Sequence, residues 1–327
     1  MRSFLILLIL PLLSFSYSLK CFRVGEVPLR FWEGKGVFTI VDSLHGKVFS
    51  LIGNEVFKME GFKFPVWAIY AGGSYYVSDI KAGKVFKISK KGKVERSLSL
   101  PRPEMIKIHN GRIYVSSGRS LYEISKDLKI LRRWTFEARS VYFYFKNDLL
   151  LWLNYWKEKN MSDVQVIDLK SGKEVRKIRA NLSRPFRFME IGKGRSVLLD
   201  YGSGDLVILE NLSPIKRIDL PRFSYGLTFF KGKILVSNLS KNFIYVVDPD
   251  SFSVRRIKTP HPFADLAVFG ENVAAAAIFN GEVTIMNLQG EVVYRKRCSY
   301  PVMLKRIQNG VAFLCSDDGK ICLLNGE

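Results

Sequence analysis

The stretch from Pro65 to Leu100, PVWAIYAGGSYYVSDIKAGKVFKISKKGKVERSLSL, is the unit that the rest of the chain repeats. It contains four short runs rich in β-branched and aromatic residues, and Gly or Asp separates them, which is typical of strands joined by tight turns. The runs are Val66–Tyr70, Ser74–Ser78, Lys84–Ile88 and Val94–Leu100. A four-stranded sheet of this size cannot bury either face alone, so the pattern predicts that similar sheets pack beside it.

The position of Asp79, at the end of the second run, recurs along the chain, and we call it the marker position. Each marker follows an apolar run, and most precede another one. The markers are Asp42, Asp79, Ser117, Asn154, Asp200, Asn238, Ala277 and Cys315. Successive markers are about 38 residues apart, except for the 46 residues between Asn154 and Asp200. This period predicts an all-β fold, a single propeller with eight four-stranded antiparallel blades.

The marker motifs resemble those of known propeller repeats. Tyr76–Asp79 reads YVSD, Tyr114–Ser117 reads YVSS and Leu235–Asn238 reads LVSN. In these motifs the chain resembles the YVTN/NHL-type and WD40-like propeller families, and the resemblance implies a fold and no particular activity. An Asp, Asn or Ser at the marker is explained by its ability to cap a tight turn, so we assign it no catalytic role.

The first 18 residues have the features of a secretory signal peptide. Arg2 precedes the apolar run Phe4–Leu13, which is too short to span a bilayer, and small residues follow. We predict cleavage after Ser16 or Ser18; the alternative is an uncleaved N-terminal anchor. Residues 19–327 would then form the propeller of a protein exported to the periplasm or the extracellular space.

The two ends of the mature chain are predicted to complete one blade. The eighth unit stops at Glu327 after its third run, whereas a spare run, Leu19–Val24, precedes the first unit. An N-terminal strand that closes the last blade would cover the free edge. Counting in repeat units places Cys322 opposite Lys20, one residue from Cys21, so we predict a Cys21–Cys322 disulfide, which export permits. The other two cysteines, Cys298 and Cys315, form either a second disulfide or two free thiols.

Positive charge recurs where the chain enters each blade. The formal net charge is +21, with 51 Lys and Arg residues. Six consecutive blades carry a basic or imidazole side chain 15 or 16 residues before the marker. This basic arc consists of Lys63, Arg102, Arg139, Arg184, Arg222 and His261. A ring of cations at one mouth of the propeller channel would attract an anion or an acidic partner. The alternative is structural, with each side chain bonded to carbonyl groups of the neighbouring blade.

The long interval after Asn154 predicts an inserted loop at the same mouth. Much of the excess fits in residues 155–162, which begin with Tyr155 and Trp156. Loops on a rigid scaffold often carry function, and aromatic rings beside cations stack on sugars, bases or side chains of a partner. We therefore expect Tyr155 and Trp156 to make contacts with a partner; the alternative is that they cover a blade edge.

Catalytic and cofactor motifs are missing from the sequence. It contains no GxSxG, HExxH, CxxCH, CxxC or Gly-rich phosphate loop. We expect its three histidines, His45, His109 and His261, to be split between the two faces, which disfavours a metal site. Acids near the predicted inner strands, Glu104, Glu190 and Asp265, have Lys107, Lys305 and Arg306 as candidate counter-ions. We predict no cofactor and no metal.

These features favour a monomeric, exported, non-catalytic propeller that acts as a binding or assembly scaffold in the cell envelope. Its partner would be an envelope protein, an anionic glycan or an anionic surface. The alternative is an enzyme or binder that takes a small anionic ligand, such as an acidic sugar, at the basic mouth. Nucleic-acid binding agrees with the charge, but predicted export and the lack of a recognition motif disfavour it.

Overall fold

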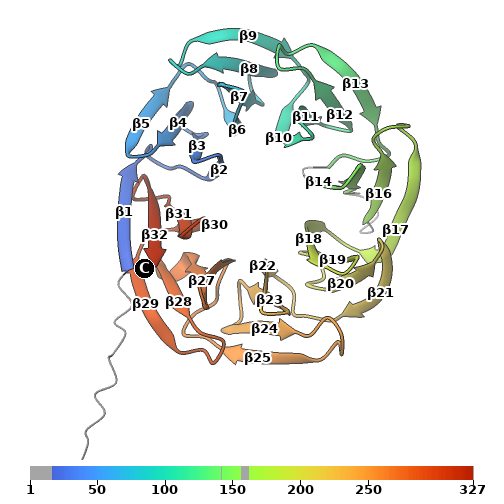
Figure 1. The fold of residues 1–327 in the computed structure, drawn as a ribbon, viewed down its shortest axis with the longest axis vertical. Coiled ribbons are helices and arrows are strands. Elements are labelled where there is room, and N and C mark those ends of the chain that lie inside the picture. Colours follow the sequence, from blue (N-terminus) through green and yellow to red (C-terminus); the bar gives the residue numbers. More distant parts are fainter. Residues whose placement is uncertain (1–16, 141, 156–161, 327) are drawn as a thin grey trace, which may run out of the picture.

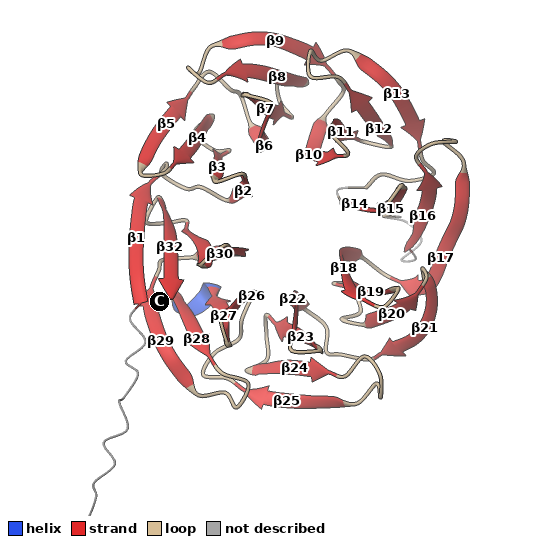
Figure 2. Ribbon diagram, in the orientation of Figure 1, coloured by secondary structure: helices blue, strands red, loops and turns tan. Residues whose placement is uncertain are grey.

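Eight four-stranded antiparallel sheets form a closed ring around a central axis within the described residues, which are 17–140, 142–155 and 162–326 of a computed structural model (Figure 1). The predicted eight-bladed propeller is therefore confirmed. Strands account for most of this part of the chain, and a single turn of 3-10 helix, Ile278–Asn280, follows one of them (Figure 2). No helix in the described ranges is long and apolar enough to cross a membrane.

Each blade consists of an inner, a second, a third and an outer strand. The inner strands are β2 (Arg30–Gly34), β6 (Pro65–Ala71), β10 (Pro103–His109), β14 (Phe143–Lys146), β18 (Pro185–Gly192), β22 (Ser224–Phe230), β26 (Asp265–Phe269) and β30 (Pro301–Ile307). The second strands are β3 (Val37–Asp42), β7 (Ser74–Asp79), β11 (Arg112–Ser117), β15 (Leu149–Leu153), β19 (Arg195–Asp200), β23 (Lys233–Asn238), β27 (Asn272–Ala277) and β31 (Gly310–Cys315). Every marker lies at the end of a second strand or directly after it.

The remaining strands lie towards the rim of the ring. The third strands are β4 (Lys47–Ile52), β8 (Lys84–Ser89), β12 (Ser120–Ile124), β16 (Ser162–Asp168), β20 (Leu206–Glu210), β24 (Phe243–Val247), β28 (Glu282–Met286) and β32 (Lys320–Gly326). The outer strands are β5 (Glu55–Met59), β9 (Val94–Ser99), β13 (Ile130–Thr135), β17 (Glu174–Leu182), β21 (Ser213–Ile218), β25 (Val254–Lys258), β29 (Val292–Arg297) and β1 (Tyr17–Arg23). We number the blades as units 1 to 8, starting with β2–β5.

The hydrophobic core lies between neighbouring blades, because each sheet buries one face against the preceding sheet and the other face against the following sheet. One cluster joins Val48 and Met59 of unit 1 to Tyr75 and Ile88 of unit 2, and all four side chains are buried. Similar clusters join other neighbouring blades around the ring. A single blade would expose these surfaces, which is why the repeat is stable only as an array.

Asp79 shows what the marker contributes. Its buried carboxylate accepts hydrogen bonds from Ala82 N–H in the following turn (2.8 Å) and from two N–H groups of the loop that enters the same blade, those of Lys63 (2.6 Å) and Phe64 (3.0 Å). The expected turn cap is present, and the tie to the entry loop is an additional finding. Asp42 and Asp200 bind the equivalent entry loops in the same way.

We predict that Asp79→Ala lowers the free energy of unfolding by about 3 kcal/mol, because three N–H groups lose a charged acceptor in a largely buried setting. Urea-induced unfolding followed by circular dichroism measures the change. Asp127→Ala is the control, since Asp127 is exposed and solvent screens its ion pair with Lys87, so its replacement should cost much less stability. Equal losses in the two variants would contradict this role for the marker.

The N-terminal strand closes the ring as the outer strand of unit 8. β1 pairs antiparallel with β32, and Cys21 lies directly opposite Cys322. The strand begins at Tyr17, two residues before the predicted Leu19, and the Tyr17 ring packs against Phe269 and Tyr294. Backbone bonding continues beyond the strand, since Val24 N–H donates to the Gly319 carbonyl at 2.8 Å.

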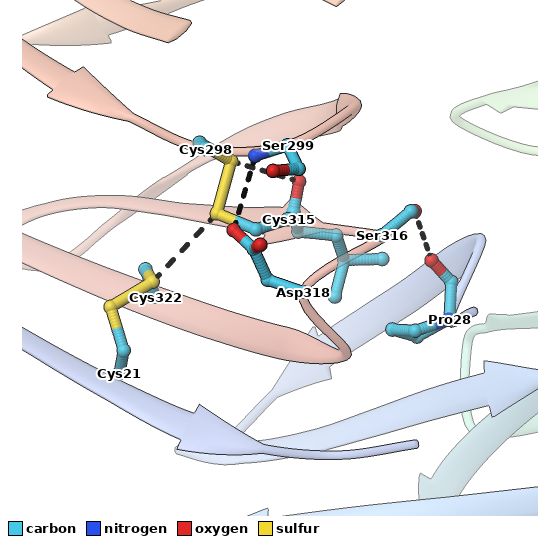
Figure 3. The surroundings of a disulfide bond; sticks show 9 residues. Cys21, Pro28, Cys298, Ser299, Cys315, Ser316, Asp318 and Cys322 are labelled. Carbon is cyan, nitrogen blue, oxygen red and sulfur yellow. Dashed lines mark hydrogen bonds between the residues drawn. A yellow bond between two sulfur atoms is a disulfide. The ribbon is translucent and has the colours of Figure 1, made fainter. Parts of the chain in front are cut away.

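Four cysteines lie together at this closure (Figure 3). The structure contains the disulfides Cys21–Cys322 and Cys298–Cys315, and the Cys315 and Cys322 sulfur atoms are 4.0 Å apart. Cys21 is exposed, whereas the other three are buried. Ser316 adds another link between the ends of the chain, because its hydroxyl donates to the Pro28 carbonyl of unit 1.

Candidate functional site

The basic arc lies on the loops that enter the blades, and several of the markers hold the backbone of these loops. Asp200 accepts a hydrogen bond from Arg184 N–H (2.6 Å), and the Asn238 side-chain amide donates to the Arg222 carbonyl (2.9 Å). The backbone of Lys63 is held by Asp79 in the same manner. The regular spacing of the arc therefore follows from backbone bonding, which leaves each side chain free to take its own direction.

The arc side chains do not form one uniform cationic ring. Arg102 and Arg139 converge on buried Glu104, with Nε of Arg102 at 3.2 Å and Nη2 of Arg139 at 2.5 Å from the same Oε1 atom. His261 Nε2 lies 3.4 Å from Glu282 Oε1. Arg222 donates to the Gly202 carbonyl at 3.4 Å, as the structural alternative predicts. Among the described residues, no carboxylate pairs with Lys63 or Arg184.

Arg184 belongs to a pocket of about 210 Å³ built by units 4, 5 and 6. The pocket brings together Arg184 and the predicted contact residue Tyr155, whose ring centroid lies 5.5 Å from the guanidinium carbon. The lining residues are Ser140, Tyr142, Leu153, Tyr155, Arg184, Pro185, Phe186, Tyr201 and Tyr225. Trp156, the other predicted contact residue, lies outside the described residues.

Aromatic rings make up much of the pocket wall. Phe186 packs against Tyr225 with ring centroids 5.0 Å apart, and the Tyr201 ring stands edge-on to both of them. Tyr155 is partly exposed and holds its place through a backbone hydrogen bond to the Arg139 carbonyl (3.0 Å). Burial raises the pKa of Tyr225, so its phenol is neutral at physiological pH and offers a hydroxyl group as well as an aromatic face.

An ion pair between partly buried Arg187 and buried Asp265 lies next to this wall. Arg187 on β18 places Nη2 2.9 Å from Asp265 Oδ1, and its guanidinium carbon lies 5.3 Å from the Tyr225 ring centroid. Burial works against the charge of Arg187, but Asp265 and nearby tyrosines outweigh it, so the pKa of Arg187 is raised. Asp265 also accepts a hydrogen bond from Leu304 N–H, which connects units 5, 7 and 8 and fixes the wall.

Four aromatic residues of the pocket were not among the predicted contact residues, although the repeat carries a signal for them. Tyr201 follows its marker directly, as Tyr155 follows Asn154. Tyr142, Phe186 and Tyr225 occupy nearly equivalent places near the start of three successive inner strands, two or three residues after an arc residue. These four residues become visible when the repeat units are aligned by their aromatic residues as well as by their charged residues.

The counter-ions of the inner acids differ from those we expected. Glu104 and Asp265 pair with arginines rather than with Lys107, Lys305 or Arg306. Lys305 donates instead to the Glu33 carbonyl at 2.8 Å. The Lys107 ammonium lies over the Tyr144 ring, 4.0 Å from its centroid, and burial lowers the pKa of Lys107 to about 7.

No cluster of three or more His, Cys, Asp or Glu side chains suited to a metal ion occurs in the described part of the chain. His45 bonds to Asp42 through Nδ1 (2.8 Å), and His109 stacks on Phe145 with ring centroids 4.2 Å apart. The arrangement that stands out chemically is therefore the pocket, which combines aromatic faces with one guanidinium group.

Neither a family model nor a curated protein matches the sequence. Solved structures match the fold. BamB from Moraxella catarrhalis has a TM-score of 0.73 at 12% identity, over 95% of this chain and 100% of that chain. The Dos1 propeller has a TM-score of 0.76 at 10% identity, over 94% of both chains. The WD40 propeller domain of Doa1 has a TM-score of 0.61 at 10% identity, over 95% of this chain and 97% of that chain.

The chain has the fold of the β-propeller repeat proteins. At these identities the likeness concerns the fold alone, and it agrees with the resemblance at the marker motifs. Because propellers support many unrelated functions, the function has to be argued from the pocket.

Proposed function

We propose that this protein is an exported, non-catalytic binding propeller of the cell envelope, and that the pocket of units 4, 5 and 6 contacts a polypeptide partner. The observation that carries the proposal is the pocket itself, which unites Tyr155 with Arg184 at the end of the ring where the chain enters the blades. Tyr and Arg are enriched among the residues that contribute most to protein–protein binding, so an aromatic pocket with an arginine at its edge suits a side chain of a partner.

Export is supported by two features of the chain ends. The first 16 residues have the composition of a signal peptide, and cleavage after Ser16 would leave the whole of β1 in place. The two disulfides at the ring closure agree with an oxidising compartment.

The alternative of a small anionic ligand held by the whole arc has less support. Glu104 already pairs with both Arg102 and Arg139 and offsets one of their two positive charges, and Glu282 lies beside His261. An anion would have to compete with these carboxylates.

Site-specific photocrosslinking tests the proposal. We predict that p-benzoylphenylalanine in place of Tyr155, irradiated in intact cells of the source organism, gives a discrete protein adduct that persists through envelope fractionation. The same probe in place of Glu271 is the control, because Glu271 is exposed in the turn between β26 and β27, at the opposite end of the ring. Adding Arg184→Ala should weaken the adduct at position 155. No adduct there, or the same adducts from both positions, would refute the contact site.

A further inference from the structure

We infer that the pocket of units 4, 5 and 6 takes one aromatic side chain of a polypeptide, and that a carboxylate next to this side chain pairs with Arg184. The inference rests on the proposed function and specifies its ligand. Size, wall chemistry and the setting of Arg184 each support it.

The pocket volume suits a single ring. A cavity of roughly 150 Å³ lined by apolar side chains is large enough to bind benzene. The present pocket, at about 210 Å³, therefore holds one phenyl or phenol ring with its methylene group and leaves little space for a second ring. A nucleobase pair, an extended polyaromatic molecule or an oligosaccharide would therefore place only one ring inside the pocket.

The wall chemistry favours an aromatic ring over a sugar. Among the residues that the structure describes, the lining includes no Asp, Glu, Asn or Gln, which are the side chains that satisfy several hydroxyl groups of a sugar at once. The Ser140 hydroxyl is already occupied, because it donates to the Tyr142 carbonyl (2.5 Å) and accepts from Tyr142 N–H (3.2 Å). Aromatic faces and edges, by contrast, surround the site and favour tilted or edge-to-face packing with another ring.

Arg184 is placed to recognise a carboxylate at the rim. Its backbone is held on both sides, since Asp200 accepts from its N–H and its carbonyl accepts from Tyr201 N–H at 3.0 Å. Its side chain is exposed beside Tyr155, and no described carboxylate pairs with it. A guanidinium group offers two parallel donors that match a carboxylate. Arg102 and Arg139 share its repeat position, but Glu104 occupies both of them.

The occupant we propose is therefore an Asp or Glu followed by Phe or Tyr in an extended segment of a partner. The high positive charge of the chain, +21, favours approach of an acidic segment. A free aromatic carboxylic acid has the same chemistry, so the experiment has to separate these two sources.

Isothermal titration with blocked tetrapeptides tests the inference on the disulfide-bonded protein from residue 17. We expect acetyl-Gly-Asp-Phe-Gly-amide to bind with a dissociation constant on the order of 1 mM, as suits one anchored ring. The Asn analogue should bind about 5- to 10-fold more weakly, which is the effect of one charge-assisted pair. The analogue with Ala in place of Phe should show no measurable binding. N-acetylphenylalanine is the free-acid probe, and a peptide source predicts that it binds more weakly than the Asp-Phe peptide.

Two variants assign the contacts. Arg184→Ala should bind the Asp and Asn peptides equally. Arg222→Ala removes the same charge from the equivalent position of the next blade but does not line the pocket, so it should keep the 5- to 10-fold preference. Equal binding of both peptides to the wild type, or the same loss in both variants, would overturn the inference. A crosslink from position 155 in a protein that ignores these peptides would leave the proposed function standing and refute only the ligand class. Peptide binding without a crosslink would support the ligand class and refute the proposed contact with an envelope partner.

Discussion

Removing the disulfide between Cys21 and Cys322 is expected to lower the free energy of unfolding by about 3–5 kcal/mol. The two cysteines are 301 residues apart in sequence, so the bond closes almost the whole chain into a loop. Reduction of unfolded-state entropy by a loop of this length is worth roughly 6 kcal/mol in the chain-entropy model, whereas measured effects of a disulfide rarely exceed about 5 kcal/mol. The bond also joins β1 to β32, the strand pair that closes the ring.

Urea-induced unfolding without reductant measures the loss in a Cys21→Ala/Cys322→Ala double variant. The matched control is Cys298→Ala/Cys315→Ala, which removes a disulfide that spans only 17 residues. We expect the control to lose about 3 kcal/mol, because a shorter loop restricts the unfolded chain less. A larger loss in the control than in the double variant would contradict the closing role of Cys21–Cys322.

Both cysteines of a pair have to be replaced together. In Cys21→Ala alone, the Cys322 thiolate would lie 4.0 Å from the Cys315 sulfur. It can attack that sulfur, form a Cys315–Cys322 bond and release Cys298 as the thiolate, which then takes up the proton that Cys322 lost. Peptide mapping under non-reducing conditions would show this exchange.

Replacing Lys107 with Met is expected to remove a pH-dependent part of the stability. Burial lowers the pKa of Lys107 to about 7, against an ordinary value of about 10.4 in the unfolded chain. Between these pH values the unfolded state binds more protons than the folded state, so the stability of the wild type rises with pH by at most about 1.4 kcal/mol per unit. Below pH 7 both states carry the proton and the cost of burying the charge is constant.

We therefore expect Lys107→Met to be more stable than the wild type at pH 7 by roughly 2–4 kcal/mol, and this difference to shrink as the pH approaches 10. Contact of the Lys107 ammonium with the Tyr144 ring offsets part of the cost of burying the charge. The gain in stability is therefore smaller than the free energy that corresponds to the full pKa shift. Denaturant unfolding of both proteins from pH 6 to pH 10 measures the difference. Lys241→Met, at an exposed position, is the control. A constant difference across this range would show that Lys107 keeps its ordinary pKa.

The fold could be predicted because its signals are local and repeated. Turn residues such as Asp79 and Gly72-Gly73 act within a few residues, and Gly72 and Gly73 both adopt positive φ angles (55° and 87°) in the β6–β7 turn. The period of the markers then specifies the number of blades. The register of the closing strand was predicted less well: counting placed Lys20 opposite Cys322, whereas Cys21 lies there. Blade registers shift at irregularities such as the one between Lys87 and Ile88, which a period does not reveal.

The candidate site, like the fold, could be predicted only in part. The sequence alone determined which positions carry the arc, because markers such as Asp79, Asp200 and Asn238 hold the backbone of their own entry loops. Only the tertiary structure decided what each side chain meets. Glu104 receives Arg102 and Arg139, whereas Arg184 joins Tyr155, Phe186 and Tyr225 from three successive blades. Backbone positions repeat because local hydrogen bonds repeat, but side-chain partners come from neighbouring blades and are decided when the sheets pack around the ring.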